Sequence, residues 1–204
     1  MSEKNPKEIS IQDKIIEAAI PLFAMKGFTG VSVRELAKAA NVNLALISYY
    51  FNGKENLYKH ILTTQFEIIS NSLTIIRKEE LLADEKMQLF TNNMIRLHKE
   101  YPHLLRLTLN EIINPTDSIS EVVRGGIGNL QMFLRECIEE GKQNRKIRQD
   151  VNSSVAALSI ISIINFYFLT LPLSKEKFIK EINSVEEYMN EALKNYFDGI
   201  RIKE

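Results

Sequence analysis

The segment 31–51 limits the fold most, because it carries signals for two short helices separated by a tight turn. Ser32 and Glu35 have the spacing of a capping box at the start of a helix. Asn41 suits the turn, since asparagine tolerates a positive φ, and Asn43 suits the cap of the next helix. Two helices this short and this closely joined have the layout of a helix-turn-helix unit.

Helical periodicity continues on both sides of this segment, and no alternating run with hairpin turns indicates a sheet. A capping signal at Ser10 begins a helix that ends at Gly27, and Pro21 predicts a kink inside it. Further helices are predicted over about 54–77, 84–101, from 102, over 119–144, 153–171 and, with a break, 175–200. The sequence therefore predicts an all-α protein.

Three glycines, Gly125, Gly126 and Gly128, fall inside one predicted helix, where each costs about 1 kcal/mol against alanine. They predict a kink or a close helix contact. They follow no strand, so a phosphate-binding glycine loop is not expected.

Composition places the chain among soluble globular proteins, with 45% hydrophobic residues, 25% charged residues and a net charge of zero. Residues 1–60 carry 8 Lys or Arg against 6 Asp or Glu, an excess that a dimer would double for phosphate binding. The single cysteine, Cys137, excludes an internal disulfide and fits a reducing compartment. The start MSEKNPKEIS carries no secretory signal, so we expect a cytoplasmic location.

The uncharged stretch 151–174 approaches the length of a membrane span. Five residues interrupt it, namely Ser159, Ser162, Asn165, Thr170 and Pro172. A helix apolar on all sides also occurs in a protein core or a subunit interface. We therefore expect no membrane association.

Enzymatic chemistry is not indicated by any motif. His98 and His103 lie off one helical face with Pro102 between them, so no metal site is expected with Glu100. Cys137 lies among apolar residues at helical spacing, as a core cysteine does. No Ser/His/Asp, Cys/His or paired-carboxylate arrangement emerges, and we expect no catalytic residue, metal or cofactor.

The segment 10–60 resembles the N-terminal domain of TetR/AcrR-family transcriptional regulators. The resemblance rests on motifs in the right order and spacing: Phe23–Phe28, Val31–Ala37, Asn41–Asn43, Tyr49–Phe51 and Lys54–Leu57. It implies a three-helix helix-turn-helix DNA-binding domain over 1–53 and a larger helical effector-binding and dimerisation domain over 54–204. It also implies a homodimer that binds a pseudo-palindromic operator, and repression relieved by a small molecule.

The third helix would enter the major groove with its first residues at the base edges. The expected DNA contacts are Ser32, Arg34, Asn43, Leu44, Ala45, Ser48, Tyr49, Tyr50 and Lys54. Of these, Leu44, Ala45 and Ser48 share one face and are the candidates for base contact, while Lys54 is expected to hold a phosphate. The helix opens without Lys, Gln or Arg, and Ser48 stands where the family often has tyrosine. Base reading therefore depends on apolar contacts, including thymine methyl groups.

The later helices supply two further sets of candidates. Apolar surface predicts a dimer interface at Ile160, Ile164, Phe168, Met189, Ala192, Tyr196 and Phe197. A mainly apolar pocket for a small hydrophobic effector is predicted at Phe90, Met94, His98, Tyr101, Leu104, Phe133 and Phe166.

A sequence-specific DNA-binding transcriptional regulator, acting as a repressor released by such an effector, is the leading hypothesis. Two alternatives stay open: a helical protein-interaction module that uses the helix-turn-helix against a protein partner, and a DNA-binding protein without an effector.

Overall fold

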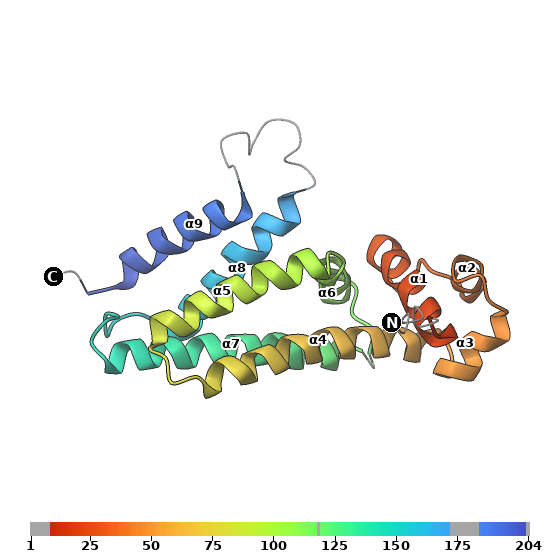
Figure 1. Ribbon diagram of the computed structural model, residues 1–204, viewed down its shortest axis with the longest axis horizontal. Helices are drawn as coiled ribbons and strands as arrows, with labels where there is room; N and C mark the ends of the chain where they lie inside the picture. The colour runs from red at the N-terminus through yellow and green to blue at the C-terminus, as the bar shows by residue number, and fades with distance from the viewer. Residues whose placement is uncertain (1–8, 118, 172–183, 203–204) are drawn as a thin grey trace, which may run out of the picture. The chain divides into compact units, whose positions relative to one another are not determined.

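The computed structural model describes residues 9–117, 119–171 and 184–202. Within those residues the chain forms helices and no strand, apart from one isolated bridge between Ile147 and Arg201. The helices are α1 (Ile11–Lys26), α2 (Val33–Ala39), α3 (Leu44–Phe51), α4 (Lys54–Lys78), α5 (Ala83–Glu100), α6 (Leu104–Ile113), α7 (Ser120–Gln143), α8 (Ser153–Thr170) and α9 (Val185–Ile200) (Figure 1). The all-α prediction is confirmed.

Most helix boundaries lie where capping signals and apolar periodicity place them. Pro21 lies inside α1, which continues through it to Lys26. The predicted stretch 175–183 of the last helix lies outside the described residues, and α9 is the part that follows Ser184, which caps it.

The chain divides into two compact units, whose boundaries differ from the division expected at residue 53. The N-terminal unit contains residues 1–65 and 106–122, and the C-terminal unit contains residues 66–105 and 123–204. The first half of α4 and most of α6 therefore belong to the same unit as α1, α2 and α3. The functional division into 1–53 and 54–204 stays a prediction.

The core of the N-terminal unit is built around α1. Ile15, Ala19 and Phe23 are buried completely along one side of that helix. Leu36 of α2 and Ile47 of α3 are buried as well, and α2 contacts both α1 and α3. The apolar periodicity of three short segments thus produces one small core that holds α3 in place.

The C-terminal unit brings α4 and α7 side by side through polar contacts. Arg77 donates from Nε to a carboxylate oxygen of Glu136 over 2.9 Å, and Asn129 donates to the hydroxyl oxygen of Ser70 over 3.0 Å. In the same unit α8 contacts α5 and α9. Cys137 is buried, as expected for a core cysteine, and burial raises the pKa of its thiol to about 12.

Helix α8 is long and apolar enough to span a membrane by length and composition alone, and a third of that stretch (33%) is buried inside the protein. Ile160 and Ile164 are buried, whereas Val155, Leu158 and Phe166 are exposed. Thus α8 has one side in the protein core and an apolar side on the surface of this chain.

One of the three helical glycines marks a close helix contact, as predicted. A Cβ atom at Gly126 would lie 2.1 Å from the ring of Phe66 on α4. Gly125 and Gly128 have open space at the same position. Only Gly126 is therefore required for the packing of α7 against α4.

We predict opposite effects for two neighbouring substitutions. Gly126→Ala should lower the free energy of unfolding by about 1–3 kcal/mol, because the buried ring of Phe66 must move. Gly125→Ala should raise it by up to about 1 kcal/mol, because alanine favours a helix. Urea denaturation of both variants measures the difference, and equal effects would contradict the contact.

Candidate nucleic-acid interface

The caps of α2 and α3 are formed as the sequence predicts. The Ser32 hydroxyl oxygen accepts a hydrogen bond from the Glu35 backbone N–H over 3.2 Å. The Asn43 side-chain oxygen accepts one from the Ala45 N–H over 2.9 Å. Between them Asn41 adopts a φ of 52°, the left-handed turn expected of it. These local bonds fix where each of the two short helices begins.

Glu35 links α2 to the end of α1. Its carboxylate accepts a hydrogen bond from the Lys26 ammonium over 2.5 Å. That bond and the charge of Lys26 lower the pKa of Glu35, helped by the backbone N–H of Ser32. An exposed pair of this kind adds little stability but restrains the orientation of the two helices.

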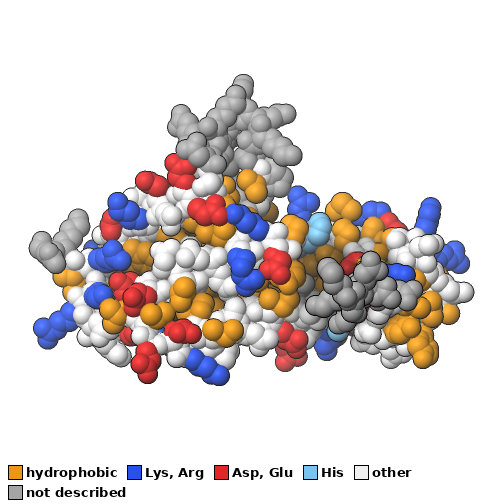
Figure 2. Space-filling model, in the orientation of Figure 1, with side chains coloured by type: hydrophobic (Ala, Val, Ile, Leu, Met, Phe, Trp, Pro, Cys, Tyr) orange, Lys and Arg blue, Asp and Glu red, His pale blue; other side chains and the backbone are white. Residues whose placement is uncertain are grey.

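The orientation of α3 follows from two buried side chains. Ile47 is 0% exposed and Phe51 is 7% exposed, so both face the core of the N-terminal unit. The opposite side of the helix therefore faces solvent, with Leu44, Ala45, Ser48 and Tyr49 exposed. We call these four residues the α3 face. Figure 2 shows hydrophobic side chains gathered where α3 lies in Figure 1.

The two tyrosines of α3 differ in their surroundings. Tyr49 is 78% exposed and Tyr50 is 37% exposed. Their rings meet edge to face, with centroids 5.0 Å apart. This contact limits the positions open to the Tyr49 ring while leaving its hydroxyl in solvent.

Positive charge lies beside the α3 face rather than on it. The helix itself, LALISYYF, contains no charged residue. Arg34 and Lys38 of α2 are exposed, and Lys54 follows α3 at the start of α4. Cations placed around an uncharged helix suit a surface that meets phosphates at its edges and bases at its centre.

Lys54 is placed differently from a freely extended phosphate ligand. Its ammonium donates to the carbonyl oxygens of Phe28 and Val31, at 2.9 Å each. It also lies 4.1 Å from the centroid of the Phe28 ring. Partial burial lowers the pKa of Lys54. The residue thus holds the loop between α1 and α2, and one of its three N–H donors remains for another partner.

A second contact to the end of α1 comes from α6 and has no sequence signal that singles it out. The Asn110 amide donates to the carbonyl oxygens of Phe23 and Ala24, over 3.0 Å and 3.1 Å. These are carbonyls of the last turn of α1, which has no further helical N–H to bond all of them. Sequence spacing could not show that α6 would reach them.

Next to Asn110, two buried polar side chains lie near each other, one on α4 and one on α6. Tyr58 is fully buried and Glu111 is 2% exposed. Burial raises the pKa of Tyr58, and the nearby Glu111 carboxylate raises it further. The Glu111 carboxylate accepts hydrogen bonds from the backbone N–H and hydroxyl of Thr116. The loop after α6 is fastened in this way to the N-terminal unit.

The residues predicted to line an effector pocket do not share one environment. Phe90 and Phe133 are buried with ring centroids 5.6 Å apart, and Met94 and Leu104 are also buried. His98 stacks on Phe168 at 4.1 Å, and burial lowers its pKa. Tyr101 is half-buried. Phe166, however, is 63% exposed and does not face this interior.

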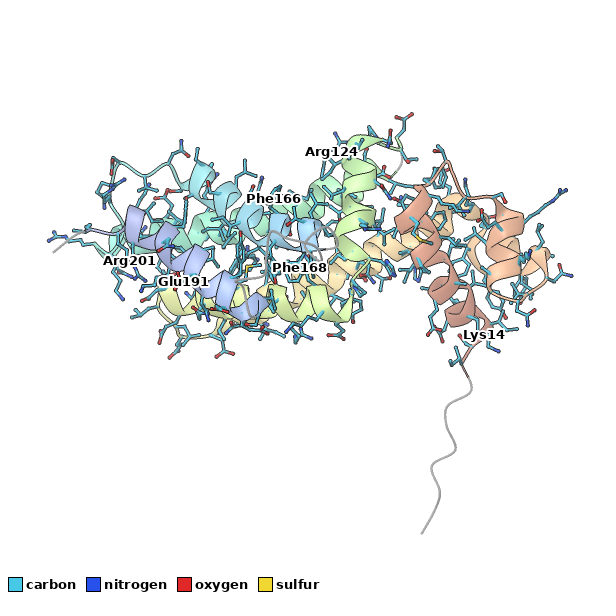
Figure 3. The ribbon with its side chains drawn as sticks, turned by 90° about the horizontal axis from the view of Figure 1, so that it is seen from above. Lys14, Arg124, Phe166, Phe168, Glu191 and Arg201 are labelled. Carbon is cyan, nitrogen blue, oxygen red and sulfur yellow. The ribbon has the colours of Figure 1, made fainter. Side chains whose placement is uncertain are left out.

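The residues predicted at the dimer interface also lie in different environments. Ile160, Ile164 and Met189 are buried within one chain, and Phe168 stacks on His98. Ala192, Tyr196 and Phe197 are half-buried on α9. Figure 3 labels Phe166 and Phe168, two residues apart on α8, and this spacing places them on different sides of the helix.

Two short helices joined by a tight turn, the second with an exposed side beside flanking cations, have the layout of a helix-turn-helix DNA-binding protein. The family model described as "Bacterial regulatory proteins, tetR family" matches residues 15–61. The chain is 30% identical over 198 residues to the probable HTH-type transcriptional regulator YttP of Bacillus subtilis, covering 96% of this chain and 92% of that protein.

Two further similarities cover most of the chain. The biofilm operon icaADBC HTH-type negative transcriptional regulator IcaR of Staphylococcus aureus is 24% identical over 178 residues, covering 87% of this chain and 90% of that protein. The solved structure of a putative fatty acid metabolism regulator from Clostridium perfringens gives a TM-score of 0.79 at 25% identity, covering 93% of this chain and 100% of that one.

The chain belongs to the TetR family and is a DNA-binding transcriptional regulator. The relatives named above are regulators rather than enzymes. In the described part of the chain, no group of three or more His, Cys, Asp or Glu side chains is placed to hold a metal ion.

We predict that Lys54→Met lowers the free energy of unfolding by about 1–2 kcal/mol, because two charge-assisted hydrogen bonds to the α1–α2 loop are lost. Lys59→Met, an exposed lysine on the same helix, should change it by less than about 0.5 kcal/mol. Urea denaturation of both variants compares them. Equal stabilities would show that the carbonyl contacts of Lys54 contribute nothing.

Proposed function

We propose that this regulator is a homodimeric repressor that binds a pseudo-palindromic operator and is released by a small hydrophobic effector. The α3 face carries this proposal, since Ile47 and Phe51 hold that helix with its opposite side in solvent. Repression is supported by the similarity to IcaR, whose name describes a negative regulator. Because one helix-turn-helix covers a single half-site, specific binding needs two copies at matched spacing.

Base edges and phosphates would be contacted by different residues. Leu44, Ala45 and Ser48 would meet the bases. Phosphate contacts would come from the residues around them, which are Ser32, Arg34, Asn43, Tyr49, Tyr50 and Lys54. Ser32 and Asn43 use their side-chain oxygens as caps, yet the Ser32 hydroxyl and the Asn43 amide can still donate to phosphate. Lys54 can contribute its remaining N–H.

The test is a titration of the protein with operator duplex and with random duplex at several salt concentrations. The operator is first recovered from random duplexes by repeated selection. We expect binding to both that weakens with salt, and operator binding tighter by at least about 10³-fold. Equal affinity for the two duplexes, or no binding at low salt, would overturn the proposal.

Two variants assign the phosphate contacts in the same titration. Tyr49→Ala should weaken operator and random duplex by similar factors, without changing the slope against log salt, because the lost group is uncharged. Lys54→Met should make the slope shallower by about one unit. Lys59→Met serves as its control. An unchanged slope would leave Lys54 as a residue that positions the loop and does not contact DNA.

The dimer would use the exposed apolar side of α8. Val155 is 61% exposed, Leu158 is 52% exposed and Phe166 is 63% exposed, although all three are large and apolar. Val155 and Leu158 also line a surface groove together with Met132 of α7, which is itself exposed. An apolar patch of this kind is typical of an interaction surface. The interface we propose therefore centres on these residues, because Ile160, Ile164 and Met189 lie in the core of the chain.

We predict that Leu158→Glu dissociates the dimer, because a carboxylate would be buried without a partner at the interface. Analytical ultracentrifugation at micromolar concentration should show a dimer for the natural chain and a monomer for the variant. Ile75→Glu is the control, since Ile75 is also an exposed large apolar side chain, at 62%, but lies on α4. A dimer that survives Leu158→Glu, or a natural chain that is monomeric, would contradict this interface.

The effector would bind within the C-terminal unit, where buried aromatic rings lie beside a few polar groups. The Phe90–Phe133 pair is flanked by the Arg77 guanidinium, 5.3 Å from the Phe133 ring centroid. An apolar lining with few charges favours a hydrophobic ligand. A compound counts as the effector only if it both raises the melting temperature and releases operator DNA.

A further inference from the structure

We propose that the α3 face recognises thymine, because Leu44 and Ala45 contact the 5-methyl groups that thymine presents in the major groove. The inference rests on the proposed operator binding and names the chemical feature of the half-site that α3 reads. Residues beside the helix would fix the register on the duplex, and methyl contacts would supply the specificity.

The chemistry of α3 excludes the common hydrogen-bonding readers of bases. Arginine and lysine read guanine, and asparagine and glutamine read adenine, each through paired hydrogen bonds. None of these four residue types occurs within LALISYYF. On the α3 face, Ser48 is the one residue before Tyr49 that carries a hydroxyl group.

The exposure of Leu44 points to an apolar partner. This side chain is 43% exposed at the first position of α3, beside the exposed Ala45. The start of a reading helix is the part that lies nearest the base edges. In the major groove, the thymine methyl is the apolar group that the base edges offer. Contact with that methyl would remove apolar surface of both molecules from water.

Arg34 provides the rival reading. It is exposed in the first turn of α2, and a guanidinium could bond a guanine directly. Selection of half-sites would then favour a G·C pair and show no dependence on methyl groups. The two readings therefore differ in which functional group of the operator must be present.

Replacing dT by dU in the recovered operator removes only the methyl group, because uracil keeps the hydrogen-bonding groups of thymine. We expect a loss of affinity of about fourfold for each contacted methyl, and about fifteenfold when both half-sites lose one. The slope against log salt should stay unchanged, since no phosphate contact is lost.

Leu44→Ala tests whether the methyl dependence comes from this side chain. The variant should bind the dT operator more weakly than the natural chain does, and replacement of dT by dU should then reduce its affinity by a smaller factor than for the natural chain, because only the methyl contact of Ala45 remains. Ile113→Ala is the control, because Ile113 is 70% exposed at the end of α6 and should keep the full dependence. Melting temperatures show that both variants are folded.

Each outcome separates the inference from the function on which it rests. Tight operator binding that dU does not weaken, or methyl dependence that Leu44→Ala retains in full, would overturn the inference and leave operator recognition standing. Selection of half-sites without a T·A pair would overturn it as well. If no duplex is preferred over random DNA, operator recognition itself fails.

Discussion

The burial of Ile47 and Phe51 is the contact on which the DNA-binding surface depends. A helix of two turns has little stability by itself, so its orientation must come from packing. These two side chains turn one side of α3 into the core and thereby expose Leu44, Ala45, Ser48 and Tyr49. If α3 were rotated so that a different pair of its residues were buried, the same helix would present another set of groups to the bases.

The end of α1 is the second constraint, because residues distant in sequence fasten it. Lys54 of α4 holds the carbonyls of Phe28 and Val31, and Asn110 of α6 holds those of Phe23 and Ala24. Within the N-terminal unit, two single side chains therefore determine how the last turn of α1 and the loop after it are held.

The sequence predicted the local structure well, since caps and turns depend on neighbouring residues. The residue type alone indicates the helix caps at Ser32 and Asn43 and the left-handed turn at Asn41. The use of apolar residues on α8 was harder to predict. Helix α8 is apolar on nearly every side, so periodicity could not distinguish Ile160 in the core from Val155 on the surface. The contacts of Asn110 and Lys54 depend on tertiary packing and carry no local signal.

Because α3 is uncharged, salt concentration should affect the affinity for DNA and the sequence specificity differently. Phosphate contacts by Arg34 and Lys54 would release counterions, so the part of the affinity that they supply must fall as salt rises. Methyl contacts by Leu44 and Ala45 would release no ions. The ratio of operator to random binding should then hold across a salt range in which both affinities fall, because the groups that discriminate between sequences are not the groups that salt screens. In this regulator, charged contacts would supply the affinity for DNA of any sequence, and apolar contacts would supply the preference for one sequence over another.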